Sequence, residues 1–179
     1  SWVESVVPSS ANIMAVYALS PTDIWAAGAN GRFWRYNGST WSLHTDSGAQ
    51  TWNDVYLISG SSGFAVGSGG AIRRWNGSSW SEVVVTGTTQ NLNTVFCSSA
   101  SECWAAGAAG TIVRWTGGTD WSLFTTTGAQ TWNDLHLTST GDGFLVGSGG
   151  NIRRWSGSAW NNVTPTGTTQ NLNGVYCVS

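Results

Sequence analysis

The sequence predicts an all-β fold, a β-propeller built from four-stranded antiparallel blades. The first observation is an internal repeat: the block from Val66 to Trp75 returns almost unchanged from Val146 to Trp155, with variants from Ala27 to Tyr36 and from Ala106 to Trp115. The second is the composition, since the chain holds 13 tryptophans and 24 glycines. The third is the lack of any helical period of apolar residues longer than a turn. Repeats of about 40 residues with four short strands each are typical of propeller blades.

One repeat is enough to define the elements of a blade. The segment from Asn53 to Ser59 has the high β-propensity of an inner strand, which would line the central channel. Turns rich in glycine and serine then separate three further strands. These elements are, in order, a turn at 60–63, a strand at 64–67, a turn at 68–70, a strand at 71–75, an Asn-Gly turn at 76–79, an outer strand at 80–85 and a connection at 86–91. A β-helix is the alternative, although its coils are shorter and less hairpin-like.

The register of the repeat divides the whole chain, as one domain, into four blades and two extra strands. The blades are expected at 14–45, 53–85, 92–126 and 133–164, with an outer strand at 2–7 and an inner strand at 172–178 left over. An unpaired inner strand exposes an edge that invites association. We therefore expect either a segment of a longer chain or a homo-oligomer. A closed ring of the four blades alone is the alternative, and in such a ring the two extra strands would belong to no blade.

Composition and charge exclude several classes of function. Charged residues make up 9% of the chain and the net charge is −2, so no basic surface for nucleic acid or an anionic membrane is expected. No apolar run is long enough to span a bilayer. No nucleophile–histidine–acid set, phosphate loop or cluster of metal ligands stands out. We therefore expect a protein that is not an enzyme and that needs no metal or cofactor.

The cysteines predict one disulfide bond. Cys97 ends an inner strand and Cys103 begins the next strand, so the turn between them sets the two residues opposite one another. Two buried free thiols are the alternative. Cys177 occupies the position of Cys97 in the last repeat, and its expected partner would lie beyond the end of the chain. Because a disulfide implies an oxidising compartment, we expect a secreted or cell-surface protein.

The repeated unit resembles two groups of bacterial propeller repeats, the BNR/Asp-box group and the photosystem-assembly-factor-like group. An inner strand is followed by a segment such as Gly63–Gly67, then by a third strand and a tight turn such as Asn76–Trp80. The cysteine pair followed by Trp104 resembles secreted members. The resemblance implies a propeller and, through the assembly-factor group, a scaffold role. The position of the Asp-box aspartate is filled by other residues, namely Asn37, Asn76, Gly117 and Ser156. No catalytic residue therefore carries over.

One repeated loop region supplies the candidate ligand site. Loops that enter the inner strands should share one face of a propeller, where ligands bind. The repeat places there Trp52, Trp132, Gln50, Gln90, Gln130, Gln170, Asn53, Asn93, Asn133, Asn173, Asp54 and Asp134. An aromatic face beside amides and carboxylates suits a sugar, and several copies of the site suit clustered glycans. A structural role is the alternative, in which the asparagines bond backbone groups and the tryptophans wedge between blades.

Two further sets of residues stand out by their register. One arginine per blade recurs beside an aromatic residue on the third strand, at Arg35, Arg74, Arg114 and Arg154. We expect these arginines to stack on neighbouring tryptophans or to bond carbonyl groups between blades, and a ring of arginines that faces a ligand is the alternative. Trp34 stands where other repeats carry Arg73 or Arg153, and we expect its side chain to be exposed to a partner.

The sequence favours a protein that binds rather than catalyses. The leading hypothesis is a lectin-like propeller that recognises glycans through several copies of one site. The alternatives are a protein–protein interaction or assembly scaffold, and an engineered or recently amplified repeat protein without a selected ligand. A hydrolase whose catalytic groups lie outside these residues is a further alternative.

Overall fold

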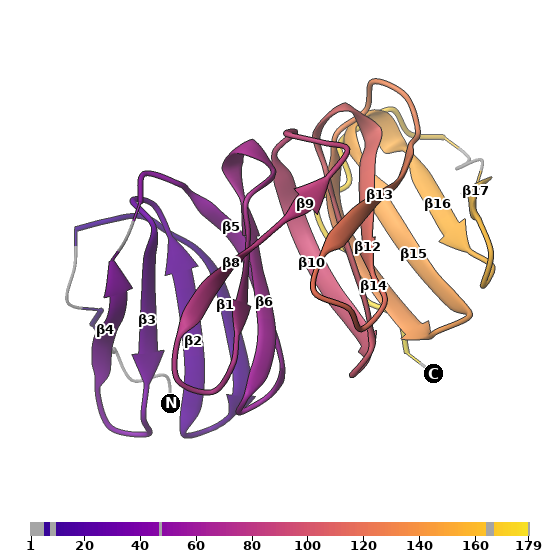
Figure 1. Cartoon of the computed structure of the whole chain (residues 1–179). Helices are drawn as coiled ribbons and strands as arrows, with labels where there is room; N and C mark the ends of the chain where they lie inside the picture. The colour runs from indigo at the N-terminus through magenta and orange to yellow at the C-terminus, as the bar shows by residue number, and fades with distance from the viewer. Residues whose placement is uncertain (1–5, 8–9, 47, 164–166, 179) are drawn as a thin grey trace.

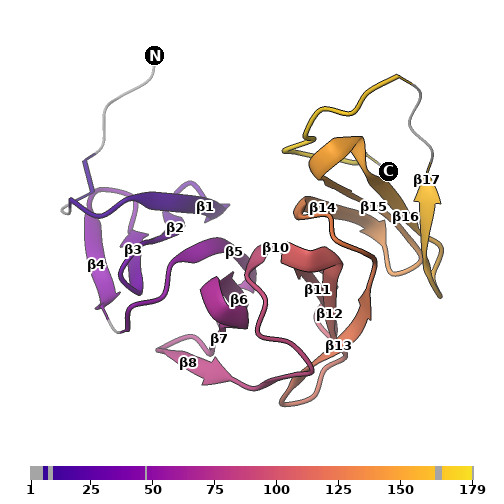
Figure 2. The same cartoon turned by 90° about the horizontal axis from the view of Figure 1, so that it is seen from above.

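Four β-sheets stand side by side around an arc that is open on one side (Figures 1 and 2). The structure is a computed structural model, and it describes residues 6–7, 10–46, 48–163 and 167–178. Within these residues each sheet joins four consecutive strands in antiparallel pairs, and the third sheet has in addition one short strand that pairs in parallel at its outer edge. The predicted fold class is confirmed: the chain is a β-propeller of repeated blades.

Each blade runs from an inner strand at the centre of the arc to an outer strand at its rim (Figure 2). The first blade consists of β1 (Ile13–Ser20), β2 (Asp23–Gly28), β3 (Arg32–Tyr36) and β4 (Trp41–Asp46). The second consists of β5 (Trp52–Ser59), β6 (Ser62–Gly67), β7 (Ile72–Trp75) and β8 (Trp80–Val83). The third consists of β10 (Leu92–Ser99), β11 (Glu102–Gly107), β12 (Thr111–Trp115) and β13 (Trp121–Thr126). The fourth consists of β14 (Trp132–Ser139), β15 (Asp142–Gly147), β16 (Ile152–Trp155) and β17 (Trp160–Val163).

Short turns with the chemistry expected from the sequence connect these strands. The side-chain oxygen of Asn76 accepts the backbone N–H of Ser78 at 3.0 Å and of Ser79 at 2.9 Å, while Gly77 adopts a φ of 97° that favours glycine. Single 3-10 turns link the second and third strands of the last three blades, at η1 (Ser68–Gly70), η2 (Ala108–Gly110) and η3 (Ser148–Gly150).

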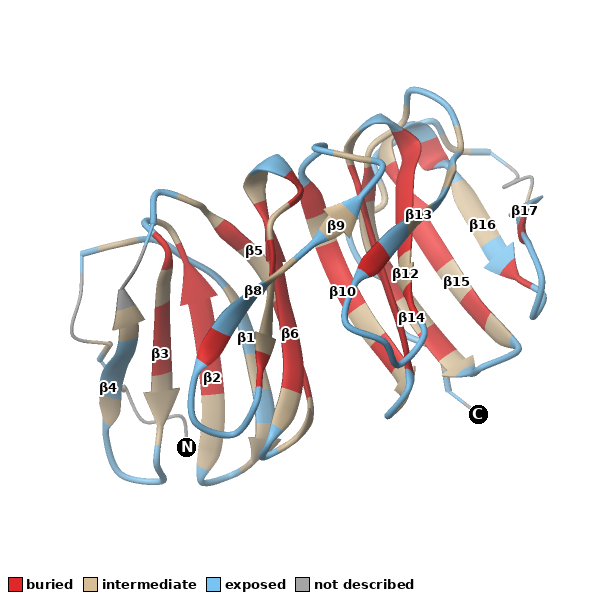
Figure 3. Cartoon of the chain, in the orientation of Figure 1, coloured by how far each residue is buried: buried red, intermediate tan, exposed pale blue. Residues whose placement is uncertain are grey.

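Aromatic rings fill the interfaces between blades. The ring centroids of Trp25 and Trp75 lie 4.7 Å apart between the first two blades, and those of Trp104 and Trp155 lie 4.6 Å apart between the last two. Phe64 takes the corresponding place between the second and third blades. Buried residues accordingly run along the middle strands of each sheet, while the turns are exposed (Figure 3). The tryptophan-rich repeat therefore forms a core that is divided into layers between sheets.

The outer strand of the second blade is shorter than the sequence predicted. It ends at Val83 rather than at Val85, and the next two residues form β9 (Val85–Thr86), which pairs in parallel with β13 of the following blade. The backbone N–H of Trp121 donates to the carbonyl oxygen of Val84 at 3.0 Å. This contact covers the outer edge of the third blade, and the side chain of Trp121 is fully buried.

The two expected extra strands are not found among the described residues. The strand at 2–7 lies outside them except for Val6 and Val7, which belong to no strand. The segment 172–178 lies beside β14 but forms no strand. The side chains of Ile13, Met14 and Val16 on β1 and of Tyr176 and Val178 are exposed at the two sides of the opening.

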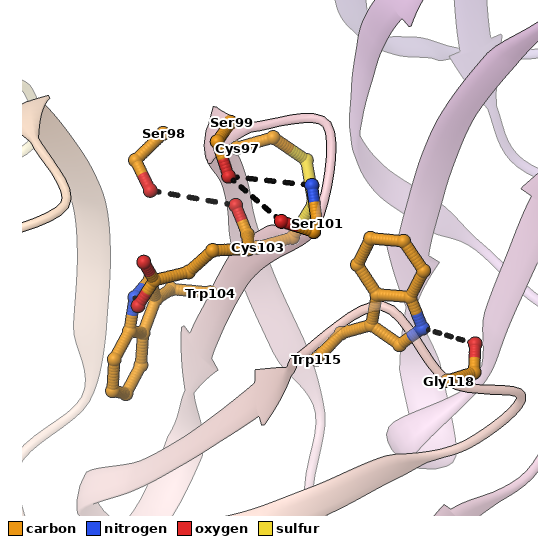
Figure 4. The surroundings of a disulfide bond; sticks show 9 residues. Cys97, Ser98, Ser99, Ser101, Cys103, Trp104, Trp115 and Gly118 are labelled. Atoms are coloured by element: carbon orange, nitrogen blue, oxygen red, sulfur yellow. Dashed lines mark hydrogen bonds between the residues drawn. A yellow bond between two sulfur atoms is a disulfide. The ribbon is translucent and has the colours of Figure 1, made fainter.

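The disulfide bond predicted from the sequence is confirmed. Cys97 on β10 and Cys103 on β11 face one another in the antiparallel register with a Cα–Cα distance of 4.0 Å, and their sulfur atoms are bonded (Figure 4). Cys177 is free and half-buried, and burial raises the pKa of its thiol. None of the described helical segments is long and apolar enough to cross a membrane.

Candidate functional site

The inner strands β1, β5, β10 and β14, together with the segment 172–178, line a groove along the axis of the arc. A cavity of about 430 Å³ follows the middle of these strands, and a second one of about 240 Å³ opens at the end where the strands begin. Asp54 and Asp134 lie in the walls of both cavities. The second cavity is called the groove mouth below. Its polar walls are formed by Asn53, Asn93, Asn133, Asn173, Asp54, Thr94 and Asp134.

Three of the four asparagines at the groove mouth bond the backbone at the corresponding position of the next repeat. The side-chain N–H of Asn53 donates to the carbonyl oxygen of Leu92 at 2.8 Å. Asn93 bonds Trp132 at 2.8 Å in the same way, and Asn133 bonds Leu172 at 2.9 Å. These bonds connect positions 39 residues apart and so repeat from blade to blade. The structural role that the sequence left open for the asparagines is thus present, in addition to their place at the mouth.

The two aspartates each bond two inner strands. The carboxylate of Asp134 accepts the backbone N–H of Leu135 at 2.9 Å and of Val175 at 2.8 Å, and it also accepts the hydroxyl of Thr94 at 3.2 Å. Burial raises the pKa of Asp54 to about 7, with a smaller contribution from the negative charge of Asp134, while two backbone N–H groups oppose this rise. The groove mouth is therefore rich in hydrogen-bond acceptors.

A row of aromatic rings extends from the middle of the groove, with one ring from each of the four inner strands and one from the segment 172–178. Consecutive ring centroids are separated by 4.7, 4.9, 4.5 and 4.8 Å along the series Tyr17, Tyr56, Phe96, His136 and Tyr176. Burial raises the pKa of the Tyr56 hydroxyl and lowers the pKa of the His136 ring. The sequence analysis did not propose this row, although an aromatic residue at the same position of every inner strand was a visible signal.

Trp52 and Trp132 do not offer ring faces to a ligand, and the expectation that they would is wrong. Their side chains are 1% and 0% exposed. Trp52 packs against Phe33 of the preceding blade with a centroid separation of 5.4 Å, and the indole N–H of Trp132 donates to the hydroxyl of Thr127 at 3.0 Å. Both tryptophans wedge between blades, which was the structural alternative.

The glutamines do not join the asparagines at the groove mouth. Gln50 lies in the wall of a separate cavity of about 740 Å³, and Gln130 donates to the backbone carbonyl of Thr127 at 2.7 Å. Gln90 and Gln170 are exposed in the connections between blades. A single site made of glutamines and asparagines together, as the sequence suggested, is therefore not formed.

The structure tests the expectations for the repeated arginines and for Trp34. Stacking on a tryptophan is confirmed for three of the repeated arginines, for example Arg114, whose guanidinium carbon lies 4.8 Å from the ring centroid of Trp104, whereas Arg154 lies over Phe144. Trp34 is fully buried, opposite Ala26 and Leu43 in its sheet, so its expected exposure to a partner is wrong. The described residues hold no group of three or more side chains suited to a metal ion.

The blades, the axial groove and the repeated register define the chain as a member of the β-propeller class. It is similar to YCF48 in a structure of YCF48 bound to D1 peptide, with a TM-score of 0.69 and 19% identity over 87% of this chain and 56% of that one. It is similar to the computationally designed Ika8 protein, with a TM-score of 0.70 and 16% identity over 93% of this chain and 52% of that one. For the designed Ika4 protein the TM-score is 0.66 and the identity 16%, over 87% of this chain and 98% of that one.

These likenesses show the fold, and at such low identities they assign no function to the chain. The chain spans about half the length of the YCF48 and Ika8 chains. No family model matches the sequence, and no curated protein matches it. The resemblance to the assembly-factor group is thus supported by structure, whereas the resemblance to the Asp-box group has no such support.

Proposed function

We propose that this chain is a non-catalytic propeller that binds an extended, basic segment of a partner protein along the groove. The observation that carries the proposal is the convergence of four asparagines and two aspartates on one mouth of the groove. Carboxylate and amide oxygens accept hydrogen bonds from lysine, arginine and backbone N–H groups. An extended peptide presents such donors at regular intervals, and the repeated acceptors of the groove match this regularity.

The buried tryptophans favour a protein ligand over a glycan. A sugar site needs an accessible ring face for stacking, and Trp52 and Trp132 supply none. The likeness to YCF48, whose structure was solved with a bound peptide, supports the same choice. The aromatic row beyond the mouth adds apolar surface for the side chains of a peptide. A secreted or cell-surface location is part of the proposal, and the Cys97–Cys103 disulfide supports it.

An array of extended peptides tests this function when basic, acidic and neutral residues are permuted along an otherwise constant sequence. Basic members of the array should bind best, and their binding should strengthen as the pH rises through about 7, because Asp54 then gains its negative charge. Asn173→Ala should weaken this binding about tenfold. Asn162→Ala is the matched control, since both asparagines are exposed but Asn162 lies on the outer strand β17.

Three outcomes would overturn the proposal. The first is an array without a binder, and the second is equal binding of basic and acidic peptides. The third is an equal effect of the two asparagine substitutions. Binding of the chain to a panel of free glycans, with no peptide bound, would instead favour the lectin-like hypothesis.

A further inference from the structure

Three of the four blades pair the arginine of the third strand with an acidic residue at the start of the second strand. Arg35 bonds Asp23 through two nitrogen atoms, at 2.8 and 2.9 Å. Arg154 bonds Asp142 in the same forked way at 2.8 and 3.2 Å, and Arg114 bonds Glu102 at 2.6 Å. This forked geometry is the one in which a guanidinium binds a carboxylate most strongly.

The second blade lacks the acidic partner. Ser62 stands where the other blades have Asp23, Glu102 and Asp142, as the first residue of the second strand. Among the described residues, the guanidinium of Arg74 forms no hydrogen bond or ion pair. A serine hydroxyl carries no charge and is too short to replace the carboxylate. The second blade therefore contains an arginine without the group that its equivalents bind.

The guanidinium of Arg74 nevertheless contacts aromatic rings, as those of its equivalents do. Its guanidinium carbon lies 5.2 Å from the ring centroid of Trp115 and 5.8 Å from that of Phe64, which is its partner in the sheet register. The guanidinium carbon of Arg35 lies 5.2 Å from the ring centroid of Trp25, its own partner in the sheet register, while it binds Asp23. Stacking and carboxylate binding thus coexist in this protein, and a stacked guanidinium loses little freedom when it binds.

We infer that Arg74 is a binding site for a carboxylate group, supplied by an acidic side chain of a partner protein. The carboxylate would occupy the position that Asp23, Glu102 and Asp142 occupy in the other blades. Two neighbouring turns, at 60–61 and 76–79, lie at the same end of the blade and are exposed, and Ser62 and Arg74 are themselves partly exposed. This end of the blade is opposite to the groove mouth, because Asn53 begins the inner strand and Ser62 follows its end. The inference does not depend on the proposed groove function.

Nuclear magnetic resonance of the arginine side chains tests the inference directly. Sodium acetate added to the whole chain at constant ionic strength should shift the Nε–H signal of Arg74 in a saturable way, with acetamide as the neutral control. The signals of Arg35, Arg114 and Arg154 should move little, because their carboxylate positions are already filled. Arg74→Gln identifies the signal by removing it. An unresponsive Arg74, or equal responses from all four arginines, would overturn the inference.

A substitution at Ser62 provides the second test. Ser62→Asp should place an internal carboxylate beside Arg74 and abolish the response to acetate, whereas Ser62→Asn should preserve it. Loss of the response in both variants, or in neither, would contradict the proposed position of the carboxylate. A capped tripeptide with a central glutamate should reproduce the acetate shift, and the same peptide with glutamine should not. A response to acetate alone would exclude a protein side chain as the ligand.

Discussion

The carboxylate of Asp54 binds the backbone of two neighbouring inner strands at once. One of its oxygens accepts the N–H of Val55 at 2.8 Å, and the other accepts the N–H of Val95, 41 residues further along the chain, also at 2.8 Å. Asp134 joins β14 to the segment 172–178 in the same way. The aspartates therefore hold adjacent blades together at the place where they also form the polar wall of the groove.

Asp54→Asn should change how stability depends on pH. The pKa of Asp54 rises from 3.8 to about 7 on folding, so the folded chain keeps a proton over this interval that the unfolded chain releases. Its contribution to stability is fully present below about pH 4 and is lost as the pH rises through about 7. Urea unfolding at about pH 5 and about pH 8 should show a loss of stability with rising pH that is larger in the natural chain than in the variant.

The variant also serves as the control for the other titrating groups. Burial lowers the pKa of His44 and of His136, so their contributions to stability increase as the pH rises and oppose that of Asp54. Both histidines are present in the two chains, and the difference between the chains therefore isolates Asp54. Equal pH dependence in the natural chain and the variant would contradict the raised pKa.

Trp132→Ala should destabilise the fold by about 3–5 kcal/mol, since it removes a fully buried indole and leaves a cavity between blades. Val84→Ala, at a position that is 61% exposed, should cost little. Urea unfolding of both variants measures the two effects. Native stability in Trp132→Ala, together with the loss of a ligand, would instead show that the tryptophan acts at a surface site.

The register of the repeat made the fold and part of the site predictable, and local distortions of the strands explain what was missed. Asparagines 40 residues apart occupy equivalent places, so their convergence at the groove mouth followed from the repeat. The repeat did not predict the orientation of the Trp52 side chain, because the pairing register of β5 shifts between Trp52 and Asp54. Such a bulge breaks the simple alternation of side chains, and it directs the indole into the core beside a carboxylate that faces the groove.

Other features depended on contacts that one repeat does not contain. The pairing of Val85 with Trp121 joins two different blades, whereas within one repeat Val85 is simply the last residue of the predicted outer strand. Trp34 stands where other repeats carry an arginine, and the sequence therefore suggested that its side chain is exposed. In the structure this side chain is fully buried in the first blade. The alignment of the blades already shows Ser62 where the other blades have an acidic residue. Only the structure shows that these acidic residues form ion pairs with the arginines of their blades, and hence that Arg74 lacks such a partner.

Removal of the Cys97–Cys103 disulfide should destabilise the chain by about 2 kcal/mol, because the bond closes only a short loop. Replacement of both cysteines by serine should lower the urea midpoint accordingly without a change in the blades. Mass spectrometry of the natural chain should show that these two thiols are blocked while Cys177 reacts. A reactive thiol at all three positions would contradict the disulfide.

The open side of the arc should promote association of the chain with a second copy. Val16 is 66% exposed on β1, where the inner strand of another blade would cover it. Light scattering should show a mass that increases with concentration, and Val16→Asp should reduce this increase. Val84→Asp is the matched control at 61% exposure on the rim. A monomer at every concentration, or equal effects of both substitutions, would argue against association through this surface.

The side-chain amides of the groove mouth provide the most direct test of peptide binding. The basic peptide that binds best on the array is titrated into the isotopically labelled chain, and the NH₂ signals of the asparagines are followed by nuclear magnetic resonance. We expect the signals of Asn53, Asn93, Asn133 and Asn173 to shift together, while those of Asn76 and Asn162, in a turn and on an outer strand, stay in place. Shifts confined to the turns and the outer strands would show that the peptide binds elsewhere and would contradict the groove as the site of function.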